Sequence, residues 1–205
     1  MALPPVLTRR KASFTVEGER VRLRSPVASD YAAWAALRAE SRAHLVPWEP
    51  SWAADELTRE SFRRRLARYR QAEREGAGYM FFIFAEPHLK LVGGIQLSNV
   101  RQGIAQSAAT MGYWTGVRFA GQGYMTDAVT AVLRHGLQRL GFHRIEAACL
   151  PNNAASRRVL AKCGFTAEGT ARKYLRINGE WQDHLLFAIV AGDPIPKPRY
   201  RDQNG

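Results

Sequence analysis

Alternating polar and apolar side chains mark the first regular element of the chain. In residues 19–26, Val21 and Leu23 stand between arginines. A period of two is typical of a strand with one buried face, so we expect a strand there. Four later runs are rich in aliphatic and aromatic residues and predict further strands, at residues 79–85, 90–100, 108–116 and 143–150.

Four other stretches repeat apolar residues with the period of an α-helix. The first begins after Ser29 or Asp30, either of which can cap it, and ends before a proline-rich loop at residues 44–50. Gly164 is placed to close the last of them. The other three helices are predicted at residues 59–75, 125–140 and 153–163.

The last two strands are expected to form a hairpin, because Asn178-Gly179 favours a tight turn between residues 165–177 and 180–190. The order β-α-α-β-β-β-α-β-α-β-β predicts one mixed-sheet α/β domain. We expect a basic N-terminal extension, this domain and a proline-rich basic tail, at residues 1–18, 19–191 and 192–205.

The composition supports a folded protein and narrows its class. Apolar residues make up 46% and aromatic residues 10%, which suffices for a full core. No apolar run approaches the ~18 residues that span a membrane, and the first residues lack the apolar stretch of a signal peptide. Only Cys149 and Cys163 occur, without the spacing of a metal site. We therefore expect a cytoplasmic protein with no membrane contact and no metal.

The net charge of +12 comes mostly from arginine, with 25 Arg against 5 Lys. Such an excess favours acidic partners such as nucleic acid, phosphorylated cofactors or acidic proteins. A high-GC genome produces the same Arg and Ala bias without functional consequence, so the charge leaves both explanations open. Residues 59–75 hold the main basic cluster, which is either a solvated helix face or a docking surface.

Two glycines stand just ahead of the predicted helix at residues 125–140, in the string VRFAGQGYM. Glycine is costly at such a place, so a bare backbone indicates that something approaches closely. Unpaired N–H groups at a helix start bind phosphate. The string is not a P-loop, and its near match to the dinucleotide fingerprint fails at Thr126. A plain helix start is the other interpretation.

This string is one of three motifs that point to a family. Residues 118–123, RFAGQG, match R/Q-x-x-G-x-G/A, the pyrophosphate loop of the GNAT acetyltransferase superfamily. Residues 151–190 resemble the N-x-x-S…GF…EG…NG…D stretch of ribosomal-protein N-terminal acetyltransferases. Residues 44–50, HLVPWEP, look like the substrate-side loop of the ribosomal-protein-alanine branch. The resemblance covers residues 20–190, and three motifs in order are far more specific than one glycine pattern.

The resemblance implies the GNAT fold, an α/β fold with a central mixed, mostly antiparallel sheet of about seven strands flanked by about four helices. The sheet would be splayed between the fourth and fifth core strands. The resemblance also implies acetyl-CoA as cosubstrate, with its pantetheine arm paired to the open strand edge and an N–H near Trp114 facing the acetyl oxygen. The residues expected to hold acetyl-CoA are Tyr113, Trp114, Thr115, Arg118, Phe119, Ala120, Gly121, Gln122, Gly123, Tyr124, Met125, Asn153 and Arg157.

The implied reaction is direct attack of an amine on the acetyl carbonyl within a ternary complex, which needs a proton acceptor. Glu146 is the first candidate by its place on a strand, although a structural glutamate paired with arginine fits equally well. Glu49 follows, as an ammonium ligand or proton relay, and a water chain is also possible. Related serine-terminus enzymes use a glutamate where this chain has Leu175. Ser156 can donate to the leaving thiolate or cap its helix.

The resemblance implies that the acceptor is the α-amine of a ribosomal protein, at an alanine terminus. Trp48, Glu49 and Tyr174 are the residues expected to bind it. Two alternatives stay open: an acetyltransferase for a small amine such as an antibiotic or polyamine, and a ribosome-associated binding protein with a secondary acyl site. As a docking surface, residues 59–75 would contact ribosomal RNA or an assembling ribosomal protein. His143 and His184 lack metal spacing and receive no catalytic role.

Overall fold

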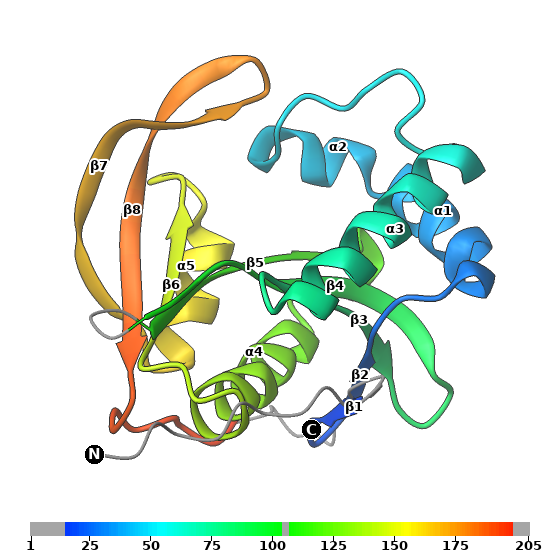
Figure 1. The fold of residues 1–205 in the computed structure, drawn as a ribbon. Coiled ribbons are helices and arrows are strands. Elements are labelled where there is room, and N and C mark those ends of the chain that lie inside the picture. The colour runs from blue at the N-terminus through cyan, green and yellow to red at the C-terminus, as the bar shows by residue number, and fades with distance from the viewer. Residues whose placement is uncertain (1–14, 104–106, 199–205) are drawn as a thin grey trace, which may run out of the picture.

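The computed structural model describes residues 15–103 and 107–198, so most of the predicted N-terminal extension and the end of the tail lie outside the described residues. Eight strands form one sheet in the order β1-β2-β3-β4-β5-β6-β8-β7 (Figure 1). The strands are β1 Thr15–Glu17, β2 Val21–Arg24, β3 Tyr79–Ala85, β4 Lys90–Gln102, β5 Ser107–Thr115, β6 Arg144–Cys149, β7 Thr166–Ile177 and β8 Glu180–Val190. The sheet thus begins at Thr15, with a strand that the sequence pattern did not predict.

All neighbouring strands run antiparallel except β5 and β6, which are parallel. The β5–β6 pairing extends only from Ala108 opposite Arg144 to Met111 opposite Ala147. Beyond this point residues 112–115 of β5 pair with β4 alone. The predicted separation of the fourth and fifth core strands is therefore confirmed, and we call this opening the splay.

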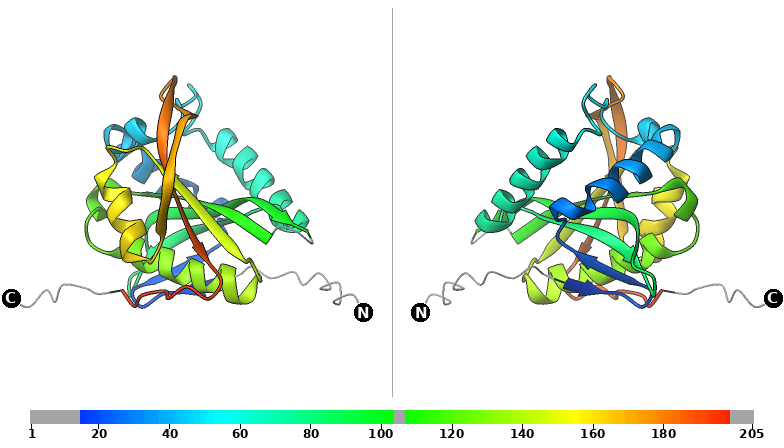
Figure 2. Two further views of the ribbon diagram at one scale, coloured as in Figure 1. Left: turned by 90° about the vertical axis from the view of Figure 1, so that its left-hand side faces the viewer. Right: turned by 90° about the vertical axis from the view of Figure 1, so that its right-hand side faces the viewer.

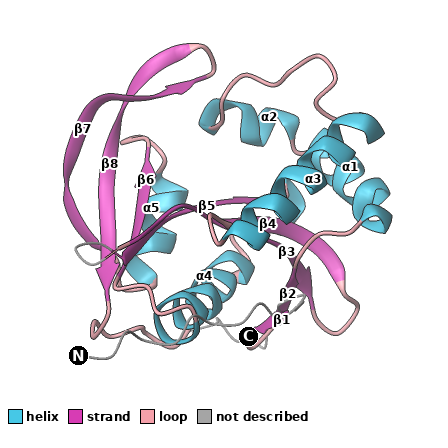
Figure 3. Cartoon of the chain, in the orientation of Figure 1, coloured by secondary structure: helices cyan, strands magenta, loops and turns pink. Residues whose placement is uncertain are grey.

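The four predicted helices are present, and Figure 3 shows how they surround the sheet. None of the described helices is long and apolar enough to cross a membrane. The helical segments are η1 Ala28–Asp30, α1 Tyr31–Glu40, α2 Arg42–Leu45, η2 Val46–Trp48, α3 Arg59–Glu75, η3 Val117–Phe119, α4 Tyr124–Arg134, the π-helical turn η4 His135–Arg139 and α5 Ala154–Lys162.

The proline-rich loop expected at residues 44–50 is largely helical, so that prediction is wrong in part. Its segment forms α2 and the 3₁₀ turn η2, with Pro47 near the start of the turn. Proline is tolerated there because the first N–H groups of a helix have no partner inside it. The segment therefore has a regular helical structure and is not an irregular connection.

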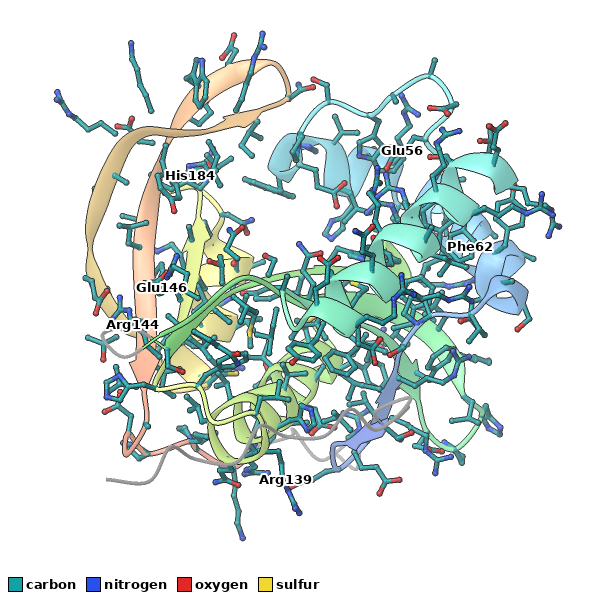
Figure 4. All side chains as sticks on the ribbon, in the orientation of Figure 1. Glu56, Phe62, Arg139, Arg144, Glu146 and His184 are labelled. Carbon is teal, nitrogen blue, oxygen red and sulfur yellow. The ribbon has the colours of Figure 1, made fainter. Side chains whose placement is uncertain are left out.

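The helices cover the two faces of the sheet unequally (Figure 2). On one face α4 and α5 pack on the main core, which contains Ile145, Ala147 and Phe187. On the other face α1 and α3 pack over β3 and β4, and Figure 4 shows Phe62 on α3. The ring centroids of Phe62 and Phe82 are 6.3 Å apart. Figure 1 shows α1 and α3 away from the β6–β8 half of this second face.

The β7–β8 hairpin turns at Asn178 and Gly179, which have φ angles of 45° and 89°. These left-handed conformations are the ones that a tight type I′ turn requires, as the sequence predicted. At the other end of the hairpin, the tail returns toward α5. A Cβ atom on Gly164 would lie 2.7 Å from the carbonyl oxygen of Pro194, so this glycine lets the tail pass close to the end of α5.

Candidate active site

The glycine turn between β5 and α4 has the geometry of an anion site. Gly121 and Gly123 have φ angles of +77° and +87°, which side chains disfavour. Within residues 15–103 and 107–198, the amides of Gly121, Gln122 and Gly123 have no hydrogen-bond acceptor. Gly123 is also the N-cap of α4, whose first-turn amides have no partner inside the helix. Open amides at a helix start fit a diphosphate.

The open stretch is shorter than the sequence suggested. The amides of Phe119 and Ala120 donate to the carbonyl oxygens of Gly116 and Val117, at 2.9 and 3.2 Å, and so close the turn η3. These two amides are therefore not available to a phosphate. The guanidinium of Arg118 is mostly exposed and lies 3.4 Å from Glu40.

The turn is held in place by the N-terminal strands. Asp127 of α4 accepts hydrogen bonds from the amides of Glu19 and Arg20, at 3.0 and 2.7 Å. The guanidinium of Arg20 also donates to the carbonyl oxygen of Gln122, at 3.1 Å. A buried carboxylate thus fixes the first turn of α4 against the β1–β2 connection, so the glycine turn is positioned before any ligand binds.

The free edge of β5 at the splay fits the addition of an extended ligand. Tyr113, Trp114 and Thr115 pair with β4 on one side, and no strand of the described residues pairs with them on the other. Exposed strand edges bind extended ligands by main-chain hydrogen bonds. Gly94 of β4 allows the Trp114 side chain to lie close to the sheet, because a Cβ atom there would be 2.6 Å from the indole Nε1.

The two faces of the splay carry different chemistry, because successive side chains of a strand point to opposite faces. Tyr113 belongs to the core face under α4 and α5, whereas Trp114 belongs to the face of α1 and α3. On the core face the hydroxyl groups of Tyr113 and Ser156 are 2.9 Å apart. Burial raises the pKa of Tyr113, so its hydroxyl stays protonated and can donate.

Ser156 does not cap its helix, so the capping interpretation of this residue is wrong. Its amide donates to Oδ1 of Asn153, at 3.0 Å, which makes Asn153 the cap of α5. The Asn153 oxygen thereby serves as the cap, and its amide nitrogen can donate to a ligand. Arg157 is exposed on the same helix and donates to the carbonyl oxygen of Pro151 at 3.4 Å.

Both cysteines are buried and unpaired. Burial raises the pKa of the Cys149 thiol and raises that of Cys163 to about 11, so both are neutral thiols near pH 7. Among the described residues, no three His, Cys, Asp or Glu side chains come together as a metal site.

Glu146 lies on the second face of the sheet, one residue before the splay opens. Its carboxylate accepts hydrogen bonds from Arg101 at 2.6 Å and from Arg144 at 2.9 Å, and Arg144 also binds Glu168. Burial alone would raise the pKa of Glu146, but the two guanidinium groups lower it below its usual value. A general base needs a pKa near the working pH, so the pairing favours a structural role.

Glu49 is also occupied by neighbouring side chains. Its two oxygens accept hydrogen bonds from Arg38 at 2.8 and 2.7 Å, and Nε1 of Trp52 donates to it at 2.8 Å. The Arg38 side chain, 7% exposed, lies 4.4 Å from the Trp52 ring and 5.1 Å from the Trp114 ring. This arrangement makes Glu49 a residue that positions the loop.

The hairpin and this loop meet above the splay. The amide of Asn178 donates to the carbonyl oxygen of Glu49 at 3.0 Å. Figure 1 shows the tip of the hairpin beside this loop. Of the predicted acceptor residues, Trp48 and Glu49 lie on the loop and Tyr174 lies on the hairpin. The structure thus brings the loop and the hairpin, the two arms, together at this point.

The comparison with known families agrees with this geometry. Residues 20–166 match the acetyltransferase (GNAT) domain. The chain belongs to the GNAT acetyltransferase family. It is accordingly an acetyl-CoA-dependent N-acetyltransferase, and the eight-stranded, mostly antiparallel sheet with its splay is the GNAT fold.

Two curated relatives cover most of this GNAT chain. A probable N-acetyltransferase of Bacillus subtilis, YjcK, is 37% identical over 77% of this chain and 86% of its own. The ribosomal protein uS5-alanine N-acetyltransferase of Escherichia coli is 34% identical over 77% of this chain and 81% of its own. Among solved structures, Mycobacterium smegmatis RimJ in complex with CoA-disulfide is 36% identical, with a TM-score of 0.82 over 87% and 88% of the chains.

The partners of three residues near this GNAT site could not be predicted from the sequence. Arg38 lies in an ordinary helical pattern, and its role depends on Glu49, which the sequence does not place beside it. The Tyr113 hydroxyl meets Ser156 from an element 43 residues away. His184 is a single histidine whose neighbours become apparent only when the hairpin folds over the sheet.

Proposed function

We propose that this enzyme transfers the acetyl group of acetyl-CoA to the α-amine of a protein N-terminus, namely that of a ribosomal protein beginning with alanine. One observation carries the proposal: the free edge of β5 at the splay lies between two sets of groups. On one face are the open amides of the glycine turn and the Tyr113–Ser156 hydroxyl pair, and on the other are the loop and the hairpin, joined by the hydrogen bond from Asn178 to Glu49. The name of the Escherichia coli relative supports a ribosomal-protein acceptor.

The residues of the first face fit acetyl-CoA, which supplies a reactive acetyl thioester when bound. The amides of Gly121, Gln122 and Gly123 would hold its diphosphate, and the free edge of β5 would pair with its pantetheine arm. The Ser156–Tyr113 hydroxyl pair would donate a hydrogen bond to the sulfur that leaves. An N–H group of the free β5 edge near Trp114 would stabilise charge on the acetyl oxygen.

The second face would receive the acceptor. A protein α-amine has a reference pKa of about 7.7–8.0, so part of it is neutral at physiological pH and can attack directly. The acceptor peptide would contact Trp48, Glu49 and Tyr174, because these residues lie on the loop and the hairpin that meet above the splay. The hydrogen bond from Asn178 to Glu49 joins the hairpin to the loop, and this favours an extended peptide end that enters beneath the two segments.

A comparison of acceptors tests the proposal. The purified enzyme would be given acetyl-CoA with a peptide of the uS5 N-terminus, spermidine or an aminoglycoside, and acetylated products would be identified by mass spectrometry. We expect acetylation of the peptide at its α-amine. Acetylation of an amine ligand alone would move the acceptor to the small-amine class, and no product with any acceptor would contradict the proposed activity.

We also propose that the exposed arginines of α3 contact ribosomal RNA. Arg64 and Arg65 are paired with Asp55 and Glu56, respectively. A second group is exposed and makes no ion pair within the part of the chain that the structure describes: Arg63, Arg68, Arg70 and Arg74. Phosphate contacts by free arginines make binding fall steeply with salt.

Sedimentation with ribosomes at increasing salt tests this contact. Replacing Arg68, Arg70 and Arg74 by Gln should reduce the slope of log affinity against log salt by about 0.7–0.9 for each phosphate that is no longer neutralised. Arg64→Gln serves as the control, since Arg64 is already paired with Asp55. Sedimentation that does not change with salt would contradict the contact.

A further inference from the structure

His184 of β8 is almost fully buried, with 3% exposure, and lies on the strand that pairs with β6 beside the splay. Its neighbours Leu185 and Phe187 pack on the main core, so His184 points to the opposite face, the one that carries Glu146. The β6–β8 pairing ends at Cys149 opposite Leu185, which places His184 just beyond the last paired residue of β6. Figure 4 shows Glu146 and His184 one above the other along this arm.

The imidazole of His184 has a defined tautomer. Its Nδ1 lies 3.0 Å from the carbonyl oxygen of Gln182. A carbonyl oxygen only accepts hydrogen bonds, so Nδ1 carries the hydrogen and Nε2 of the neutral ring carries the lone pair. Nε2 makes no hydrogen bond to any described residue. The ring packs against the edge of Tyr174, with centroids 5.8 Å apart, which limits its rotation.

The two carboxylates that compete for the same role are bound to guanidinium groups. Glu146 on β6 lies between Arg101 and Arg144, and Glu49 on the loop is bound by Arg38. The other titratable group that contacts His184 is the Tyr174 phenol on β7. Nε2 of His184 is therefore the basic atom on this face whose lone pair no described residue uses.

We propose that Nε2 of His184 is the proton acceptor for the attacking amine, an inference that rests on the proposed acetyl transfer. The lone pair of the neutral amine forms the C–N bond, and the C–S bond breaks with its electron pair on sulfur. The N–H proton of the amine goes to Nε2, and the sulfur takes a proton from the Ser156–Tyr113 pair. The imidazolium then returns its proton to water, from which the hydroxyl pair is reprotonated.

Imidazole rescue tests this role. In His184→Gly, kcat for the uS5 peptide should fall by about 10²–10⁴-fold, the usual contribution of a general base. Added imidazole should restore part of kcat, and the more basic 4-methylimidazole should restore more. Peptide acetylation is measured by mass spectrometry, so that acetylation of imidazole itself is not counted. Acetyl-CoA binding, measured by calorimetry, should be unchanged.

Two further variants keep the result interpretable. His88→Gly, in the exposed β3–β4 turn, is the matched control and should behave as wild type with and without imidazole. His184→Gln retains a donor for the Gln182 carbonyl but has no basic nitrogen, so it should lose kcat even if His184→Gly does not fold.

Two results would overturn the role of His184, and a third would contradict the proposed function instead. A kcat of His184→Gln within about threefold of wild type would overturn the proposal. A folded His184→Gly that binds acetyl-CoA, is slow and is not rescued by either imidazole would also overturn it. A wild-type enzyme that acetylates no amine would instead contradict the proposed function, and this is seen before any variant is measured.

Discussion

Arg38 and Glu49 are joined by two parallel hydrogen bonds, Nη1 to Oε1 at 2.8 Å and Nη2 to Oε2 at 2.7 Å. Arg38 belongs to α1 and packs over Trp114 of β5, while the main chain of Glu49 accepts a hydrogen bond from Asn178 at the hairpin tip. This one ion pair therefore connects the helical half of the molecule, the splayed strand and the hairpin. The placement of the loop against β5 and the hairpin tip depends on it.

Removal of the Glu49 carboxylate should damage the acceptor side and spare the cofactor side. In Glu49→Ala we expect KM for the acceptor peptide to rise and the Kd for acetyl-CoA to stay the same. The free energy of unfolding should fall by roughly 3 kcal/mol, because the buried Arg38 charge loses its main partner. Denaturant unfolding and calorimetry measure the two effects.

The matched control for that variant is Glu60→Ala. Glu60 forms an exposed pair with Arg64, and its side chain is 81% exposed, so its removal should cost at most about 0.5 kcal/mol. Equal destabilisation by both variants would show that the Arg38–Glu49 pair is an ordinary surface contact.

Gly123→Val should weaken acetyl-CoA binding at least about tenfold, because the left-handed conformation is strained for valine and the turn loses its open amides. Gly192→Val provides the control: Gly192 also has a positive φ, +102°, and lies far along the chain from the turn. It should be destabilised without loss of acetyl-CoA affinity. Calorimetry with CoA distinguishes them, and equal affinities in both variants would remove the phosphate site.

Ser156→Ala and Tyr113→Phe should each lower kcat by about tenfold or more while leaving acetyl-CoA affinity nearly unchanged. The reason is that their hydroxyl groups face each other at 2.9 Å and, on this account, act on the leaving sulfur. Steady-state kinetics beside calorimetry makes the comparison. Parallel losses of kcat and affinity would assign the pair to binding alone.

The Glu146 ion pairs predict a specific pH dependence of stability. The folded pKa of Glu146 is lowered by Arg101 and Arg144, so its ionised form stabilises the fold above the unfolded pKa of about 4.3. That contribution disappears as pH falls through the lowered pKa. Melting curves of wild type and Glu146→Gln should differ at pH 7 and converge in strong acid. A constant difference would mean that the carboxylate charge does not stabilise the fold.

Local patterns predicted the elements whose structure is determined by neighbouring residues. The hairpin at Asn178-Gly179, the helix closed by Gly164 and the glycine turn at Gly121 and Gly123 all depend on conformations that glycine or asparagine permits. The splay followed from family resemblance, and its position agrees with the end of β5–β6 pairing. The sequence did not show that the amides of Phe119 and Ala120 donate hydrogen bonds within the turn, because these bonds belong to the 3₁₀ turn η3.

The roles of single polar residues could not be read from the sequence. Glu49 looked like an available carboxylate until the structure placed Arg38 and Trp52 on its oxygens. Glu146 looked equally available, and its partners come from β4 and from its own strand. His184 has no motif, and its face is set by pairing with β6 and by bulges in β7. Such roles arise from contacts between distant segments.

The most direct test of acetyl transfer to a ribosomal protein is mass spectrometry of ribosomal-protein N-termini from a strain lacking the gene. The account predicts that one alanine terminus loses its acetyl group, and that the wild-type gene restores it while the Gly123→Val gene restores little. Ribosomal N-termini acetylated identically with and without the gene would contradict it.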